Sequence, residues 1–167
     1  CAGFKWLLGM PGTGFLYVNK KAQKYIKPVL PGMYSAENNY RELHYLPDAR
    51  RYETGTLAYS LFHAWTAGLE LLQEIGISNI HAHVLKLTDI IIAGMGSKNI
   101  MIVSPVETIN ERSAILAFTM GSAAANQKCY EKLRENNVIV TLRDSHIRVS
   151  PNFYNTEEEI ERFLELL

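Results

Sequence analysis

The stretch AGFKWLLGMPGTGFLYV, residues 2–18, sets the first constraint on the fold. It places Lys5 between Phe4 and Trp6, continues through a glycine-rich turn and then enters an apolar run. The run at residues 14–19 is rich in aromatic and β-branched residues and predicts a short buried strand. Apolar neighbours would partly desolvate the lysine and favour its neutral amine, the form that attacks carbonyl groups. A lysine whose stem lies along a strand edge gives the same pattern, so both interpretations stay open.

The composition is that of an ordinary globular protein. The chain has 167 residues, of which 47% are hydrophobic and 20% charged, enough for one domain or a little more. Seventeen basic residues balance seventeen acidic ones, so we expect no nucleic-acid or membrane-surface partner. No apolar run approaches a bilayer span and no leader opens the chain, which favours a cytoplasmic protein without a membrane segment. The two cysteines, Cys1 and Cys129, cannot build a disulfide framework, and no Cys or His spacing indicates a metal site.

The first 75 residues predict only part of a domain. Residues 21–51 show no sustained period, which in a compact domain indicates a functional loop. Residues 57–75 carry apolar side chains at helical spacing, and Gly76 would end that helix. One strand and one helix cannot enclose a core, so residues 1–75 are predicted to be a remnant of a larger domain. We expect the tyrosines of the loop to lie against another part of the protein or a partner subunit: Tyr25, Tyr34, Tyr40, Tyr45 and Tyr52.

Residues 76–167 predict a small α+β domain. Ser78 is expected to cap a helix that ends at Gly94 or Gly96. Strands and helices then follow in the order β-β-α-β-β-α, at residues 99–105, 113–120, 122–135, 137–142, 146–150 and 154–167. Either Asn155 or Thr156 can cap the final helix, because each has a glutamate three residues later.

Four segments together resemble the C-terminal part of the class V aminotransferases. This family of pyridoxal 5'-phosphate (PLP) enzymes includes cysteine desulfurases, selenocysteine lyases, kynureninase and isopenicillin N epimerase-like proteins. The resemblance covers nearly the whole chain and lies in FKWLLGMPGTGFLYV (4–18), RRYETGT (50–56), LLQEIGISNIHAHV (71–84) and IRVSPNFYNTEEEIERFLELL (147–167). It implies an α/β fold, the C-terminal part of the aspartate aminotransferase-like (fold type I) architecture, which ends in the small α+β domain.

The resemblance also implies site residues. Lys5 would hold PLP as an internal aldimine, and Gly55 and Thr56 would bind the cofactor phosphate, commonly of the neighbouring subunit in a homodimer with a shared active site. Arg148 would bind the carboxylate of an amino-acid substrate. Alternation in HIRVS puts Arg148 on the face opposite Ile147, where its planar fork is free to grip a carboxylate. The simpler alternatives are an exposed strand arginine at position 148 and a helix cap at Thr56.

Two departures from the cysteine desulfurase pattern bear on the reaction. Phe4 stands where the wider family usually has His, Gln or Arg, and residues 140–148 leave no room for the loop that carries the desulfurase cysteine. We therefore expect transamination, epimerisation or lyase chemistry on an amino acid. Desulfurase or selenocysteine lyase-like activity and a non-catalytic dimerisation module stay as alternatives. In the family the ring-binding residues precede the lysine, so this chain alone is expected to be an inactive fragment.

Overall fold

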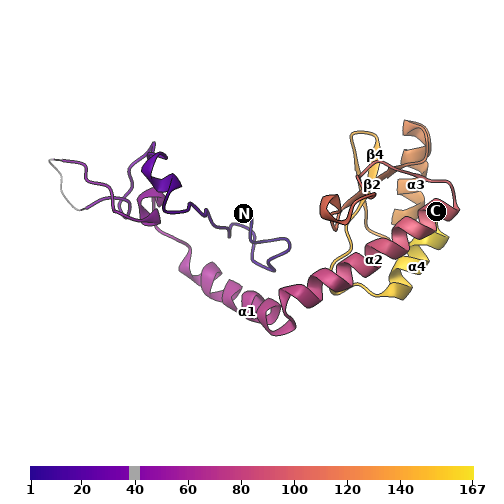
Figure 1. Ribbon diagram of the computed structural model, residues 1–167, viewed down its shortest axis with the longest axis horizontal. Helices are drawn as coiled ribbons and strands as arrows, with labels where there is room; N and C mark the ends of the chain where they lie inside the picture. The colour runs from indigo at the N-terminus through magenta and orange to yellow at the C-terminus, as the bar shows by residue number, and fades with distance from the viewer. Residues whose placement is uncertain (38–41) are drawn as a thin grey trace. The chain divides into compact units, whose positions relative to one another are not determined.

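The computed structural model describes residues 1–37 and 42–167 (Figure 1). The chain divides into two compact units, Cys1–Glu74 and Ile75–Leu167. The assignment of the first unit as the remnant of a large domain stays a prediction. Tyr40, one of the tyrosines expected to lie against another surface, is outside the described residues.

The first unit has little regular structure. Two short 3-10 helices, η1 (Ala22–Lys24) and η2 (Ala49–Tyr52), flank a long irregular segment. Helix α1 (Tyr59–Ile75) follows, which confirms the predicted helix with a start two residues later. Gly76 ends α1 with a φ of +86°, a conformation that glycine adopts at little cost.

The predicted strand at residues 14–19 does not form in this unit. Gly14 makes an isolated antiparallel bridge with Ala2. Phe15, Leu16 and Tyr17 are 51%, 69% and 77% exposed. A strand needs a neighbour for its N–H and C=O groups, and the described residues of this unit offer no neighbouring strand to residues 16–19.

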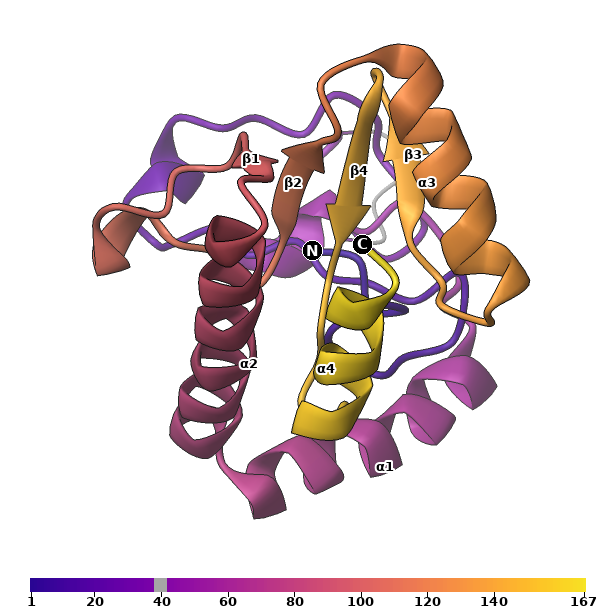
Figure 2. The same ribbon diagram turned by 90° about the vertical axis from the view of Figure 1, so that its right-hand side faces the viewer.

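The second unit contains a four-stranded antiparallel sheet. Its strands are β1 (Met101–Ile102), β2 (Leu116–Thr119), β3 (Thr141–Arg143) and β4 (His146–Val149). They lie in the order β1-β2-β4-β3, as Figure 2 shows. The helices are α2 (Ile77–Ser97), η3 (Ile109–Glu111), α3 (Ala123–Glu135) and α4 (Glu157–Glu165). The predicted β-β-α-β-β-α order is confirmed.

One face of this sheet packs against helices. Alternate strand residues point to that face, where Phe118 and Ile147 are fully buried. The core is completed by apolar residues of α2, α3 and α4: Leu87, Ile91, Met95, Cys129, Leu133, Ile160 and Phe163. The opposite face, which carries Ala117 and Arg148, is not covered by these helices. The unit therefore has two layers, one of helices and one of strands.

The first residues of α2 and α4 show which residues cap these helices. One predicted cap is wrong, and the choice between the other two is decided. Ser78 does not cap α2, because the cap is Gly76, the residue with positive φ between the end of α1 and the start of α2. Thr156 caps α4: its hydroxyl accepts a bond from the Glu159 N–H, and the Glu159 carboxylate accepts one from the Thr156 N–H. Asn155 is not the cap, and its side chain donates to Glu159 Oε2 instead.

Candidate functional site

Lys5 lies on a tight turn that backbone hydrogen bonds close. The Leu8 N–H donates to the Lys5 carbonyl oxygen at 3.1 Å, and the Gly9 N–H donates to that of Gly3 at 2.8 Å. The Gly3 N–H donates in turn to the Thr13 carbonyl oxygen at 2.9 Å. Residues 3–9 thus form a closed loop with Lys5 near its tip.

Two buried side chains, Thr13 and the α1 residue Trp65, donate hydrogen bonds to the backbone of this segment. The Thr13 hydroxyl donates to the Met10 carbonyl oxygen, and the Trp65 indole N–H donates to the Leu7 carbonyl oxygen, each at 2.7 Å. A Cβ atom at Gly3 would lie 2.6 Å from Thr13 Oγ1 and 2.8 Å from Trp65 Cζ2. The packing therefore requires glycine at position 3, and the position of the lysine loop depends on α1.

The amine of Lys5 is exposed, contrary to the expected desolvation. Its Nζ lies 5.9 Å from the centroid of the Phe4 ring, and Phe4 itself is 47% exposed. The neighbouring apolar side chains of the described chain therefore do not enclose the lysine. The amine is consequently accessible to a carbonyl compound.

Gly55 and Thr56 line a pocket of about 540 Å³ in the first unit, together with Phe15, Tyr52 and Phe62. A Cβ atom at Gly55 would meet nothing within 4 Å, so packing within the described chain does not require glycine there. Such a bare backbone leaves room for a ligand or a second chain to approach.

The Thr56 side chain does not cap α1. The helix begins at Tyr59, and its first turn is closed by a bond from the Phe62 N–H to the Ala58 carbonyl oxygen. Among the described residues, the Thr56 hydroxyl has no hydrogen-bond partner. Lys5 does not line the pocket that contains Gly55 and Thr56, so the structure does not bring these predicted site residues together.

Arg148 lies on β4, in the second unit, with Ala117 opposite it on β2 and Thr141 opposite it on β3. Ile147 and Val149, on either side of it, point into the core, as alternation predicts. Its Nε atom is buried and has no hydrogen-bond partner within residues 1–37 and 42–167. No carboxylate of the described residues forms an ion pair with it. The guanidinium is therefore free to bind an anion from outside this unit.

Asn126, on α3, holds the hairpin that carries Arg148, and the sequence patterns do not reveal it. Its side chain is 1% exposed and accepts a bond from the Met120 N–H at 2.6 Å. It also donates to Thr119 Oγ1 at 2.9 Å and to the Ser145 carbonyl oxygen at 2.5 Å. It thus ties the end of β2 to the turn between β3 and β4.

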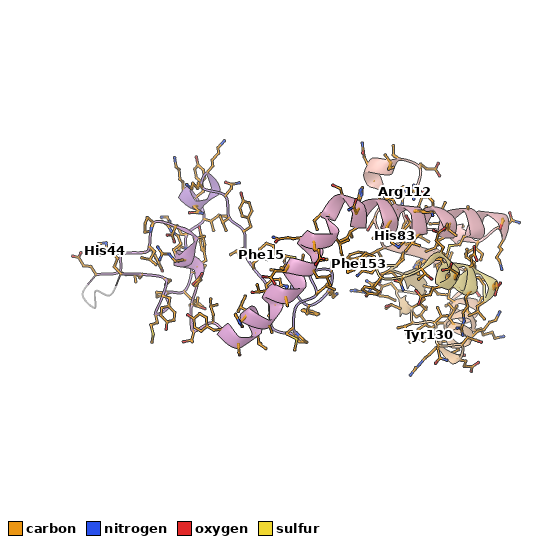
Figure 3. All side chains as sticks on the ribbon, turned by 90° about the horizontal axis from the view of Figure 1, so that it is seen from below. Phe15, His44, His83, Arg112, Tyr130 and Phe153 are labelled. Carbon is orange, nitrogen blue, oxygen red and sulfur yellow. The ribbon has the colours of Figure 1, made fainter. Side chains whose placement is uncertain are left out.

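Arg112 is a second residue that the sequence patterns do not reveal. It lies beside α2, the helix that carries His83 (Figure 3). Its Nη2 atom donates to Thr88 Oγ1 at 3.1 Å and is 2.6 Å from Asp89 Oδ1. This pair connects the segment before β2 to the middle of α2.

Cys129 is unsuited to nucleophilic chemistry. It lies in the core of the second unit, and burial raises the pKa of its thiol, which disfavours the reactive thiolate. Only two residues, Asp144 and Ser145, separate β3 from β4, so no cysteine-bearing loop is present between these strands.

Comparison with known proteins identifies the family. The model of the aminotransferase class-V family matches residues 1–163. The chain belongs to this family. It is 32% identical over 156 residues to an uncharacterized aminotransferase, YcbU, of Bacillus subtilis (strain 168), and this match covers 93% of the chain but 40% of that protein. The chain thus spans about two fifths of the length of the curated relatives it matches.

Solved structures show the same fold. The apo cysteine desulfurase from Thermococcus onnurineus NA1 matches with a TM-score of 0.86 at 20% identity, over 99% of this chain and 44% of that one. The cystine C-S lyase C-DES, in complex with its reaction product cysteine persulfide, matches with a TM-score of 0.84 at 22% identity, over 98% of this chain and 44% of that one. The predicted α/β fold, a part of the architecture of these solved structures, is confirmed. Among the described residues, no helix has both the length and the apolar content to cross a membrane.

Proposed function

We propose that this chain is the C-terminal part of a PLP-dependent enzyme that acts on an amino acid. The supporting observation is the guanidinium of Arg148, whose buried Nε has no partner among the described residues, on the face of the sheet that the helices of this unit leave open. An arginine whose buried Nε lacks a partner carries an unmet hydrogen-bonding demand that a carboxylate satisfies with two parallel bonds.

The residues in the chain fit the cofactor. Lys5 offers an exposed amine on an anchored loop, and Gly55 offers a bare backbone beside the unpaired hydroxyl of Thr56. An amine can form an imine with the aldehyde of the cofactor, and an amide N–H and a hydroxyl can donate hydrogen bonds to its phosphate. When bound, PLP supplies an electron-withdrawing ring that stabilises negative charge on the Cα atom of an amino acid.

Each residue then has a distinct role. Lys5 would hold the cofactor and, once the substrate amine has displaced it, take the proton from the substrate Cα atom and return it. Arg148 would fix the substrate carboxylate and so the orientation of Cα. Gly55 and Thr56 would bind the phosphate of the cofactor held by the neighbouring subunit in a homodimer. This role agrees with the pocket described above, which Gly55 and Thr56 line and Lys5 does not.

Transamination, epimerisation and lyase chemistry all begin with removal of a group from Cα, and all suit these residues. Persulfide chemistry is disfavoured, because Cys129 is buried and the β3–β4 turn holds no cysteine. The cytoplasmic location expected from the sequence stays a prediction.

Covalent trapping tests this proposal. The full-length protein that contains this chain is incubated with PLP, reduced with borohydride and digested, and the pyridoxyl mass is located by peptide mass spectrometry. We expect the tag on Lys5. The variant Lys5→Ala should lose it, and Lys20→Ala, which removes an exposed lysine of the same unit, should keep it.

A tag on other lysines, or none in folded protein, would overturn the proposal and favour a non-catalytic dimerisation module. The isolated 167 residues should show no turnover of amino acids in the same assay.

A further inference from the structure

The uncovered face of the sheet carries three basic side chains in a row. In the β3–β4 ladder, Thr141 lies opposite Arg148 and Arg143 lies opposite His146. Directly opposite residues of an antiparallel pair project to the same face, and so do alternate residues of one strand. Arg143, His146 and Arg148 therefore share the face that the helices of this unit leave open.

Among the described residues, the strands place no acidic side chain on this face to balance them. The four strands contain neither Asp nor Glu. The nearest carboxylate is that of Asp144, in the turn, at 3.5 Å from Arg143 Nε. Because the two side chains are 89% and 73% exposed, this ion pair is weak and open to competition by a ligand. The residues opposite Arg148 are small, Ala117 and Thr141.

The spacing of the two arginines suits a ligand with two carboxylates. Arg148 lies two residues from His146 on β4, about 7 Å along the strand, and Arg143 lies across from His146 at about 5 Å. His146 Nδ1 donates to the Asp144 carbonyl oxygen at 2.8 Å, so its ring is fixed by the turn. Two flexible arginine side chains can converge from these positions on carboxylates a few atoms apart.

We propose that Arg143 is a specificity-determining residue that binds the side-chain carboxylate of an acidic amino acid about as long as glutamate. Arg148 binds the α-carboxylate of the same molecule, so this inference rests on the proposed function. The neutral isostere, glutamine, cannot form the charge-assisted bonds that Arg143 offers and is the disfavoured substrate.

Equilibrium binding tests the site without any turnover. Glutarate, a five-carbon dicarboxylate, and pentanoate, a five-carbon monocarboxylate, are titrated into the full-length protein by calorimetry. We expect glutarate to bind about tenfold more tightly than pentanoate, the usual effect of one hydrogen bond to a charged group. Arg143→Gln should remove this difference and leave pentanoate binding unchanged, whereas Arg148→Gln should weaken both.

A matched control is Arg134→Gln, at an exposed position in the last turn of α3, which should bind both ligands as the wild type does. Arg143→Lys, which keeps the charge, should retain part of the preference. If the wild type binds the two ligands equally, or if Arg143→Gln weakens both alike, the inference is wrong.

Turnover separates this inference from the proposed function. Once a reduced sample has shown the tag on Lys5, turnover is measured on unreduced, PLP-loaded protein. There kcat/KM should be about tenfold higher for glutamate than for glutamine, and Arg143→Gln should abolish that ratio. Equal use of both amino acids would refute the specificity role and leave the PLP proposal standing. Absence of the Lys5 tag together with selective glutarate binding would refute the PLP proposal and leave the dicarboxylate site.

Discussion

The indole N–H of Trp65 donates a hydrogen bond to the backbone carbonyl oxygen of Leu7, two residues after Lys5. The bond is 2.7 Å long and Trp65 is 5% exposed, so solvent does not compete for it. Since Leu7 and Lys5 belong to one closed loop, α1 determines where the lysine loop sits. A residue 60 positions away in the sequence thereby controls the placement of the proposed PLP lysine.

Replacement of this indole should loosen the lysine loop. Trp65→Phe keeps an aromatic ring but leaves the Leu7 carbonyl oxygen without its donor and removes packing volume. We expect a loss of about 1–3 kcal/mol in the free energy of unfolding, measured by urea titration of the full-length protein, and slower borohydride trapping of PLP on Lys5. Tyr59→Phe, at an exposed position of the same helix, is the control and should change neither. If Trp65→Phe had the unfolding free energy and the trapping rate of the wild type, another contact would anchor the loop.

Removal of the Asn126 side chain should release the β3–β4 hairpin. Asn126→Ala leaves the Met120 N–H, the Thr119 hydroxyl and the Ser145 carbonyl oxygen without this partner. Because these groups lie in a buried environment, the cost should be about 2–3 kcal/mol in the free energy of unfolding. Hydrogen exchange of the amides in β3 and β4 should accelerate.

The neighbouring Gln127→Ala provides the control for Asn126, because Gln127 is exposed on the same helix. Asn126→Asp retains an acceptor for the Met120 N–H but sets a charged carboxylate against the Ser145 carbonyl oxygen, so at pH 7 it should be at least as destabilising as Asn126→Ala. If Asn126→Ala and Asn126→Asp were as stable as the wild type, the β3–β4 hairpin would not depend on Asn126.

Local patterns predicted the second unit well. Alternation in HIRVS placed Ile147 in the core and Arg148 on the opposite face, because a strand has a fixed period of two. The start of α4 could be narrowed to two residues, and the reciprocal bonds of Thr156 and Glu159 decided between them. Such features depend on neighbours within a few positions of the sequence.

Features that depend on distant contacts were beyond these patterns. Residues 14–19 have the composition of a strand, but a strand forms only beside another strand, and the described part of this unit supplies none. Phe4 and Trp6 suggested a partly desolvated lysine, but Lys5 is exposed. Asn126 looked like an ordinary helix residue, since only the fold brings Thr119 and Ser145 to it.

Two glycines of α2 should respond to alanine in opposite directions. A Cβ atom at Gly94 would lie 2.4 Å from Leu164 Cδ1, where α4 packs against α2, whereas a Cβ atom at Gly96 would meet nothing within 4 Å. Gly96→Ala should raise the free energy of unfolding by up to about 1 kcal/mol, because alanine restricts the unfolded chain and favours helix.

Gly94→Ala gains the same propensity but must displace Leu164, with an overpacking cost of about 1–3 kcal/mol. Urea unfolding of both variants beside the wild type measures the difference. A stability gain in Gly94→Ala equal to that in Gly96→Ala would show that Leu164 moves aside freely.

The first turn of α4 should make stability depend on pH below neutrality. The pKa of Glu159 is lowered from its ordinary value of 4.5, chiefly by the hydrogen bond from the Asn155 side chain and then by that from the Thr156 backbone N–H. The pKa of Glu158 is lowered too, chiefly by a hydrogen bond with the Thr156 side chain. Between the folded and unfolded pKa values the unfolded chain binds more protons, so stability rises with pH in that range.

The contribution of these glutamates is therefore complete above their unfolded pKa and is lost as the pH falls through the folded one. Glu159→Gln should reduce the loss of stability between pH 5 and pH 3, measured as the urea midpoint at each pH. Thr156→Ala should cost about 1 kcal/mol at pH 7, because it removes the cap itself. Glu161→Gln, outside the capping box on the same helix, should keep the acid response of the wild type. An unaltered acid response in Glu159→Gln would mean that the Glu159 hydrogen bonds do not couple protonation to folding.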